Sequence, residues 1–289
     1  MTELFFARAG RAGPTDLVTR IPELAPLREK TVSLFGLGAL GAPCALELAR
    51  AGVGELRVLD GDIVDPATVV RWPIGFTAAG LPKSQVIAET IERNYPFTRV
   101  LGIPHRLGGV RNGEPKESSD HEVVEKMTAG TSAILDATAE VGVQHFLSDL
   151  ARELGVPFIC VDATFGAWGG NVCRVRPGKT AGCWMCYRAS CLDRDRTIVP
   201  PPEDPKGEVQ PAGCADPTFT GTSFDLGIVA LFAVRTLIST LCEGAAGGYP
   251  ESEWDAVTIS LRNESGGFVL PQFQGYVLLP HKDCPRCGA

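Results

Sequence analysis

The sequence contains no cluster of basic residues. Its 27 lysines and arginines are scattered among 34 aspartates and glutamates, and the formal net charge is −7 with a pI near 5.2. Proteins that bind nucleic acid carry a concentrated basic patch that meets the phosphate backbone. We therefore expect no nucleic-acid partner.

The sequence also has no recognisable export signal and no uninterrupted membrane span. Residues 1–4 lack a basic region followed by an apolar one, which predicts that there is no signal peptide. The apolar run from Leu226 to Leu241 is broken by Gly227 and Arg235, so it predicts a buried helix and no membrane contact. We expect a cytoplasmic location, where paired cysteines usually serve metal binding or catalysis.

The composition is that of an ordinary globular protein, with 44% hydrophobic and 21% charged residues and no internal repeat. A chain of 289 residues can form one large α/β domain, or a domain with a small lobe. Residues 1–30 form a weakly patterned lead-in with three prolines, for which we predict one short helix near residues 15–19 and little more.

From Thr31 onward, apolar strands alternate with amphipathic helices. We predict strands at 32–35, 55–60, 99–103, 132–136 and 157–162, and helices at 42–51, 83–94, 119–128 and 143–154, with a surface loop at 107–119. Such alternation builds a mostly parallel sheet that is covered by helices on both faces. The expected fold is therefore α/β, a doubly wound, Rossmann-like sheet.

The pattern changes in the second half of the chain. We predict a strand at 171–176, a long crossover loop at 176–221, a helix at 223–242 and short strands at 256–261, 267–270 and 275–279. A loop of that length inside a compact domain is usually functional or mobile. We divide the chain into the lead-in 1–30 and one domain 31–289, made of residues 31–170 and a second half with the crossover loop and a C-terminal extension (171–289).

A glycine motif follows the first predicted strand. Gly36, Gly38 and Gly41 have the spacing G-x-G-x-x-G between a strand and a helix, where the backbone can approach a phosphate. Asp60 ends the next strand, where a carboxylate can accept hydrogen bonds from ribose hydroxyls. Together they favour a nucleotide site over a tight turn packed with glycine, and taken alone they would favour a dinucleotide dehydrogenase.

Two cations and a second acid favour a triphosphate instead. Arg71 and Lys83 lie beyond the second strand, which is unusual for a nicotinamide site but suits phosphates that must be neutralised as pyrophosphate leaves. The alternative for each is a solvated surface charge. Asp136 ends a strand at the carboxyl edge of the sheet, where it can hold Mg²⁺; its alternative is a helix N-cap.

Four cysteines form two C-x-x-C pairs, Cys183 with Cys186 and Cys284 with Cys287. Four thiolates make a closed tetrahedral site for structural zinc, whereas a single pair could be a redox pair or a coincidence. The sequence therefore predicts a structural Zn²⁺ site that ties the C-terminal end to the segment after residue 176. Residues 31–170 are then the nucleotide-binding half, and residues 171–289 are the half with the zinc-stapled C-terminal extension.

The other six cysteines divide into two groups. Cys44, Cys160, Cys173 and Cys242 lie in apolar helices or strands and are expected to be buried and inert. Cys191 and Cys214 lie in the predicted crossover loop. A flexible, exposed thiol near a helix N-terminus, as we expect for Cys214, can serve acyl transfer; the alternative is an ordinary loop cysteine.

Together these motifs resemble the ThiF/MoeB/HesA family, whose fold is shared by the adenylation domains of ubiquitin-activating enzymes. The resemblance runs from about Thr31 to Cys287 and rests on Gly36-Leu37-Gly38-Ala39-Leu40-Gly41, Leu59-Asp60-Gly61-Asp62, Arg71, Gly80-Leu81-Pro82-Lys83, Asp136-Ala137-Thr138 and the two C-x-x-C pairs. It implies that Asp60, with Asp62 beside it, holds the ribose of ATP, that Arg71 and Lys83 hold the phosphates, and that Asp136 holds Mg²⁺. Cys214 matches a position where several members carry a reactive cysteine.

The sequence departs from the family pattern at three positions and lacks a clear match for one further residue. Many members have Asn where this chain has Thr68, Gln or His after the arginine where it has Trp72, and Asp where it has Ala139. The N-terminal arginine that often reaches into a partner subunit has no clear match, although Arg8 and Arg11 are candidates.

The resemblance implies ATP-dependent adenylation of the C-terminal glycine of a ubiquitin-like protein, followed by thioester formation and transfer to a conjugating enzyme supplied in trans. Residues 69–75 with 136–139 look more like the activating domains of bacterial ubiquitin-like conjugation systems, found in antiphage (antiviral defence) operons, than like thiamin or molybdopterin enzymes. A homodimer is implied. The alternatives are a sulfur-carrier-protein adenylyltransferase in thiamin or molybdopterin biosynthesis, an NAD-dependent oxidoreductase, and an inactive scaffold.

Overall fold

The computed structural model describes residues 10–11, 13–108, 119–194, 197–210, 218–245 and 252–287. The strands are β1 (Thr31–Phe35), β2 (Glu55–Leu59), β3 (Arg99–Ile103), β4 (Ala133–Asp136), β5 (Phe158–Ala163), β6 (Gly169–Val175), β7 (Glu208–Val209), β8 (Thr218–Phe219), β9 (Ala256–Arg262) and β10 (Phe268–Tyr276). The α-helices are α1 (Pro14–Leu17), α2 (Gly41–Arg50), α3 (Lys83–Asn94), α4 (Asp120–Thr128), α5 (Val141–Leu154), α6 (Trp184–Leu192) and α7 (Ser223–Leu241). Short 3-10 helices are η1 (Pro22–Glu29), η2 (Pro66–Val70), η3 (Phe76–Ala78) and η4 (Phe165–Ala167).

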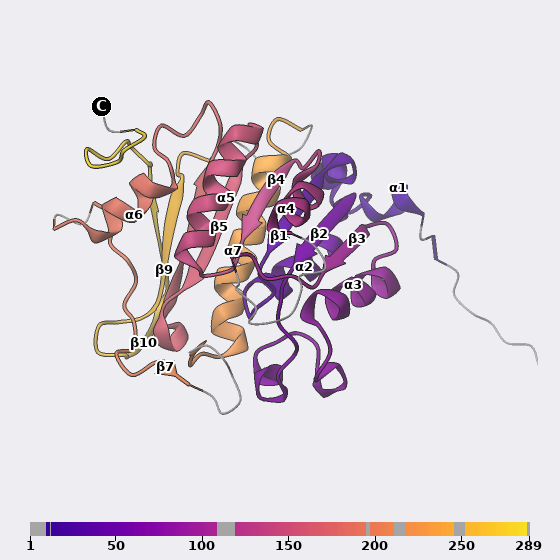
Figure 1. Ribbon diagram of the computed structural model, residues 1–289, viewed down its shortest axis with the longest axis horizontal. Coiled ribbons are helices and arrows are strands. Elements are labelled where there is room, and N and C mark those ends of the chain that lie inside the picture. The colour runs from indigo at the N-terminus through magenta and orange to yellow at the C-terminus, as the bar shows by residue number, and fades with distance from the viewer. Residues whose placement is uncertain are drawn as a thin grey trace, which may run out of the picture.

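An eight-stranded sheet forms the centre of the molecule, with the order β10-β9-β6-β5-β4-β1-β2-β3 (Figure 1). Strands β1 to β5 pair in parallel, while β6, β9 and β10 join the sheet through antiparallel pairs. The order 3-2-1-4-5 is that of a Rossmann-type sheet, in which the order of strand addition reverses between β1 and β4. The predicted fold class, a mostly parallel, doubly wound α/β sheet, is confirmed.

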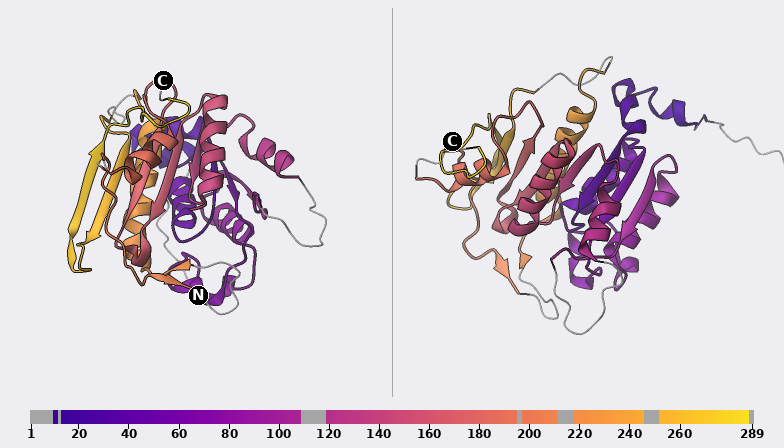
Figure 2. Two further views of the ribbon diagram at one scale, coloured as in Figure 1. Left: turned by 60° about the vertical axis from the view of Figure 1, so that its left-hand side comes forward. Right: turned by 45° about the horizontal axis from the view of Figure 1, so that its top comes forward.

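Helices cover both faces of the sheet (Figures 1 and 2). One buried apolar cluster joins β1, β2 and β5 to α2, α3 and α7, and a second joins β4, β5 and β6 to α4, α5 and α6. Side chains alternate between the two faces of a strand, so a strand that is covered on both sides must be apolar throughout. The buried run Val32–Phe35 in β1 is apolar except for Ser33, whose hydroxyl donates to the Met127 carbonyl oxygen.

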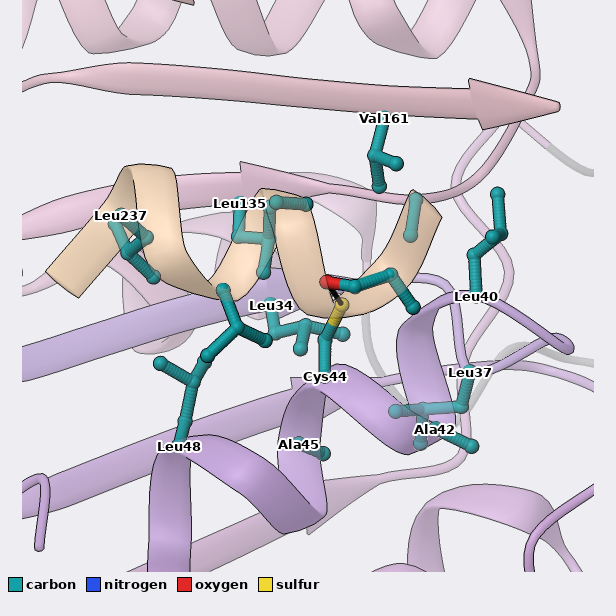
Figure 3. Close-up of a cluster of buried hydrophobic side chains, with 14 of the residues drawn as sticks. Leu34, Leu37, Leu40, Ala42, Cys44, Ala45, Leu48, Leu135, Val161 and Leu237 are labelled. Carbon is teal, nitrogen blue, oxygen red and sulfur yellow. Dashed lines mark hydrogen bonds between the residues drawn. The ribbon is translucent and has the colours of Figure 1, made fainter. Parts of the chain in front are cut away.

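Small residues let α2 lie close to α7 in the first cluster. Ala42 and Ala45 of α2 are fully buried, and the Cys44 thiol donates to the Ala230 carbonyl oxygen of α7 at 3.5 Å (Figure 3). Burial raises the pKa of Cys44 to about 12, so this thiol stays protonated at neutral pH. Cys160, Cys173 and Cys242 are buried as well, as predicted.

Helix α7 is the only helix, among the residues that the structure describes, that is long and apolar enough to cross a membrane. It packs instead against β5, β6 and α2, and half of its apolar window is buried inside the molecule. The prediction of a buried helix in this segment is confirmed. The expected cytoplasmic location stays a prediction.

The structure corrects three predicted elements. The segment 176–221, predicted as a loop, contains α6 and the hairpin strands β7 and β8, so Cys191 lies in a helix. The two short strands predicted at 267–270 and 275–279 are one strand, β10, with a register irregularity between Phe268 and Gln272. The lead-in contains η1 besides α1, because Leu24 and Leu27 bury their side chains in the first apolar cluster.

Candidate functional site

The ends of three parallel strands meet where the strand order reverses. Phe35, the last residue of β1, pairs with Leu59 on one side and with Asp136 on the other. In open α/β sheets, ligands bind outside the carboxyl ends of the strands at this reversal. The glycine motif after β1, Asp60 after β2 and Asp136 at the end of β4 therefore share one edge of the sheet.

The three glycines of the motif have different surroundings. Gly36 has φ +85°, and a Cβ there would lie 2.7 Å from the Ala137 carbonyl oxygen; a Cβ at Gly41 would lie 1.9 Å from the Gly36 carbonyl oxygen. Both positions need glycine for the packing of the turn onto α2 and β4. Among the described residues, no atom lies within 4 Å of such a Cβ at Gly38, so space remains beside this position of the turn.

The turn is fixed by two side chains that hold the peptide groups of Leu37. The Leu37 N–H donates to Asp60 Oδ2 at 2.5 Å, and Trp72 Nε1 donates to the Leu37 carbonyl oxygen at 2.8 Å. Burial raises the pKa of Asp60, although Lys83 and the N–H groups of Asp62 and Leu37 act in the opposite direction. Trp72, a departure from the family pattern, thus supports the glycine turn directly.

Lys83 begins α3 and lies over the loop that follows β2. Its Nζ forms an ion pair with Asp62 Oδ2 at 2.8 Å, and its backbone N–H donates to the Asp62 carbonyl oxygen at 3.0 Å. The Lys83 side chain is only 12% exposed, whereas that of Asp62 is 60% exposed. The ammonium group is therefore held near Asp60, at the same edge of the sheet as the glycine turn.

Arg71 contacts the crossover segment. Its guanidinium donates to the Phe219 carbonyl oxygen and, at 2.7 Å, to Thr218 Oγ1, and it lies 5.0 Å from the centre of the Phe219 ring. Burial lowers the pKa of Arg71. The residue predicted to bind phosphate thus anchors β8, the strand that follows residues 211–217.

Asp136 is fully buried at the end of β4. Its Oδ1 accepts hydrogen bonds from the N–H and the hydroxyl of Thr138, both at 2.8 Å, while Oδ2 has no hydrogen-bond partner among the residues that the structure describes. Burial raises the pKa of Asp136 to about 7, the hydrogen bonds from Thr138 lower it, and the charge of Asp162 raises it further. A buried carboxylate oxygen without a donor suits a divalent cation, because an unpaired buried charge is costly.

Ala139, another departure from the family pattern, has a left-handed backbone with φ +59°. This conformation is uncommon for alanine and is better tolerated by Asn, Asp or Gly. The loop after β4 therefore keeps a backbone that suits an aspartate, although the side chain here is a methyl group.

The four cysteines of the two C-x-x-C pairs come together in space. Their sulfur atoms all lie within 4.8 Å of one another, with Cys183 Sγ 3.7 Å from Cys186 Sγ and 3.6 Å from Cys284 Sγ. Four sulfurs at about 2.3 Å from a tetrahedral zinc ion are roughly 3.8 Å apart. The cluster thus fits Zn²⁺ in both donor type and spacing.

The cysteine cluster lies at the opposite edge of the sheet from the glycine turn. Strand β6 runs antiparallel to β5, and β10 runs antiparallel to β9, so both end at the amino edge of the parallel strands. Cys183 follows β6 and Cys284 follows β10, which brings the C-terminal segment beside α6 (Figure 1). This separation supports a structural role for the cluster.

The remaining predicted residues are placed as follows. Cys191 is 9% exposed in α6, and burial raises its pKa to about 11, which does not suit an acyl-transfer thiolate. Arg11 is exposed and lies 3.7 Å from Asp16. Cys214 and Arg8 lie outside the described residues, so their roles stay predictions. Thr138 was not predicted as a site residue, although it stands in the Asp136-Ala137-Thr138 motif.

Comparison with known proteins identifies the family. The family model described as "ThiF family" matches residues 14–260, which is most of the chain. The chain belongs to the ThiF family. The sequence resemblance to this family, and the fold that it implied, are confirmed.

Several ThiF relatives are similar along much of the chain. Two uncharacterised Sinorhizobium fredii proteins, y4oA and y4qC, are each 33% identical over 95% of this chain and 46% of their own length. The sulfur carrier protein ThiS adenylyltransferase of Escherichia coli is 28% identical over 66% of each chain. The chain thus spans about half the length of the first curated relatives that it matches.

Solved structures show the same fold. E. coli MccB, in a crystal structure with ATP, has a TM-score of 0.65 at 17% identity and covers 92% of this chain and 68% of its own. PaaA has a TM-score of 0.64 at 16% identity and covers 95% of this chain and 77% of its own. At these identities the likeness shows only that the ThiF-type fold is shared.

Proposed function

We propose that the chain is an adenylyltransferase that uses Mg·ATP to activate the C-terminal glycine carboxylate of a ubiquitin-like protein. The observation that carries the proposal is the convergence of the glycine turn, Asp60, Lys83 and Asp136 on one edge of the sheet. Named relatives with ThiF domains support the activity, including the ThiS adenylyltransferase and a SAMP-activating enzyme E1 of Haloferax volcanii.

Each residue has a role in this proposal. Asp60 would accept hydrogen bonds from the ribose, and the glycine turn would lie against the phosphates. The acceptor carboxylate attacks the α-phosphorus, the bond to the pyrophosphate oxygen breaks, and an acyl-adenylate forms. Lys83, with Arg71 if its guanidinium leaves β8, would neutralise the departing phosphates. Asp136 would hold Mg²⁺, which would supply charge stabilisation during phosphate transfer.

The thioester step is a second part of the proposal. The Cys214 thiolate would attack the carbonyl carbon of the acyl-adenylate, and AMP would leave. The product would then pass to a conjugating enzyme in trans, with the activating chain acting as a homodimer. The contacts of Arg71 with Thr218 and Phe219 support this part, because they tie the end of the crossover segment to the predicted phosphate site.

A sulfur-carrier protein is the second candidate acceptor. The ThiS adenylyltransferase supports it, because that relative is matched over two thirds of each chain. In this case the acyl-adenylate would serve sulfur transfer and Cys214 would carry no conjugation intermediate. The adenylation site itself would be the same.

We infer further that Cys183, Cys186, Cys284 and Cys287 hold one structural Zn²⁺. Their sulfur spacing supports this, as does their distance from the nucleotide edge. Thiolates at a closed four-ligand site leave no position for a substrate.

ATP–pyrophosphate exchange tests the adenylation step. The full chain should catalyse exchange only with an acceptor that ends in glycine, and Lys83→Ala should lower the rate by about 100-fold or more. The matched control is Lys126→Ala, an exposed lysine on α4, which should keep the rate. Exchange that does not respond to Lys83→Ala would contradict the proposed site.

The same preparations separate the alternatives. Cys214→Ala should abolish a reducible adduct with the acceptor while sparing exchange, and an adduct that persists would contradict the thioester step. Tight NADH binding without ATP binding would select an oxidoreductase. Absence of exchange with every glycine-terminated acceptor would select an inactive scaffold.

A further inference from the structure

A second carboxylate, Asp162, lies next to Asp136. The register of β4 and β5 pairs Asp136 with Cys160, and Asp162 is two residues further along β5. Side chains two residues apart on a strand point to the same face, so Asp136, Cys160 and Asp162 share one face of the sheet. Both carboxylates therefore lie at the carboxyl edge, on adjacent strands.

The electrostatics agree with this placement. Burial raises the pKa of Cys160, and the charges of Asp136 and Asp162 both raise it further, which puts this thiol within reach of both acids. Burial also raises the pKa of Asp162, while the hydrogen bond from Asn171 and the charge of Arg188 lower it. Two acids in a shared, largely buried environment repel each other unless a cation lies between them.

Asn171 holds Asp162 from the next strand. The register of β5 and β6 pairs Asp162 with Asn171, and Asn171 Nδ2 donates to Asp162 Oδ1 at 2.6 Å. Asn171 is only 8% exposed, yet its Oδ1 has no hydrogen-bond partner within the described part of the chain. Asp136 Oδ2 is buried and, within the same residues, also lacks a partner. Buried acceptor oxygens that lack donors, one on Asp136 and one on the residue that holds Asp162, indicate an oxygen-ligand site for a hard cation.

We propose that Asp162 is a second carboxylate ligand of the Mg²⁺ ion that accompanies ATP, with Asn171 as the residue that positions it. This inference rests on the proposed adenylation function and adds a residue to its site. Mg²⁺ is usually held by one or two carboxylates together with phosphate oxygens and water. Asp136 and Asp162 would be these two carboxylates, and the ion would offset their mutual repulsion.

Mn²⁺ binding to the full chain tests the proposal independently of catalysis. Free Mn²⁺ can be counted by electron paramagnetic resonance during a titration, without nucleotide and then with a non-hydrolysable ATP analogue. Asp162→Asn should weaken Mn²⁺ binding at least about tenfold in both series. Glu140→Gln removes an exposed carboxylate four residues from Asp136 and should leave the affinity unchanged.

The role of Asn171 needs a readout that a packing defect would not give. Asn171→Ala should weaken Mn²⁺ binding in the wild-type background but cause no further loss when Asp162 is already Asn, because its effect passes through that carboxylate. Equal losses in both backgrounds would assign Asn171 to packing. Asp162→Ser, which keeps an acceptor for Asn171, replaces Asp162→Asn if the latter does not fold.

The outcomes separate this inference from the proposed function. Unchanged Mn²⁺ affinity in Asp162→Asn, in a chain that still exchanges pyrophosphate, overturns the role of Asp162 and leaves adenylation in place. Mn²⁺ binding that depends on Asp162, in a chain that never exchanges pyrophosphate, supports the metal site and removes the adenylation proposal.

Discussion

The peptide groups of Leu37 are held from both sides by residues that are remote from it in the sequence. Asp60 accepts from its N–H, and Trp72 donates to its carbonyl oxygen. Leu37 is fully buried, so water does not compete for these two hydrogen bonds. The glycine turn is therefore held in place without a ligand, which is the preorganisation that the proposed phosphate binding would need.

Trp72→Phe tests this support. Phenylalanine keeps most of the buried apolar surface but leaves the Leu37 carbonyl oxygen without a donor, at a cost of about 1–3 kcal/mol. We expect a Tm lower by roughly 2–10 °C and an ATP affinity weaker by several-fold. Differential scanning fluorimetry and titration calorimetry measure the two effects.

Trp254→Phe is the matched control, because Trp254 stacks on Arg174 and Phe232 away from the glycine turn. It should lower the Tm without changing ATP affinity. If both variants weakened ATP binding in proportion to their loss of stability, the specific role of Trp72 would be excluded.

At the level of single residues, the sequence predicted that Asp60 and Asp136 lie at strand ends but could not assign their contacts. Asp60 and Asp136 end parallel strands, so the fold alone brings them to one edge. The bond from Trp72 to Leu37 spans 35 residues, and no local pattern predicts it. Asp162 belongs to no motif and is significant only because β4 and β5 are neighbours.

Among the secondary-structure elements, the hairpin of β7 and β8 depends on Arg71. Val209 pairs with Thr218 and Glu208 with Phe219, so the hairpin has only two residues per strand. Such a short hairpin is marginal by itself. The two hydrogen bonds and the ring contact from Arg71 attach it to η2 and the loop after β2.

Arg71→Lys should release this hairpin while keeping the positive charge. A lysine lacks the planar guanidinium that donates to both the Phe219 carbonyl oxygen and the Thr218 hydroxyl. Amide hydrogens at 207–210 and 218–220 should therefore exchange at least several-fold faster. Hydrogen–deuterium exchange with mass spectrometry measures this directly. Arg50→Lys, at an exposed arginine beside Tyr95, should leave those peptides unchanged.

Saturating Mg·ATP gives a second arm of the same experiment. If Arg71 binds the phosphates, as the sequence predicts, its guanidinium must leave β8. ATP should then also speed amide exchange in the hairpin of the wild-type chain. Protection of the hairpin on ATP binding would instead show that Arg71 keeps its contacts with β8.

Helix α6 shows why the predicted crossover loop was wrong in part. The segment Cys183–Leu192 is rich in cysteine and aromatic residues and has weak helix propensity. Its helix is stabilised by tertiary contacts, since Trp184 and Tyr187 are buried against the sheet. The strands and helices of residues 31–163 were predictable because their periodicity is local, whereas α6 forms only in the context of the whole fold.

On the scale of the whole molecule, the cysteine cluster and the glycine turn occupy opposite edges of one sheet. The cluster joins the end of β6 to the segment after β10, and both strands lie in the half of the sheet that pairs antiparallel. A bound zinc ion would therefore stabilise this half and fix the C-terminal segment beside α6. The glycine turn, Asp60 and Asp136 follow or end the parallel strands β1, β2 and β4, at the other edge.

Loss of zinc should consequently lower stability without removing the nucleotide site. We expect one zinc per chain by metal analysis, and Cys287→Ser should reduce this content and lower the Tm by about 10 °C, because closed thiolate sites contribute folding energy. ATP affinity at 20 °C should change less than threefold, since the strands that hold Asp60 and Asp136 stay paired.

Lys282→Ala, an exposed neighbour in the same segment, should keep both zinc and Tm. A variant that lost ATP binding while still folded would show that the two edges of the sheet are coupled.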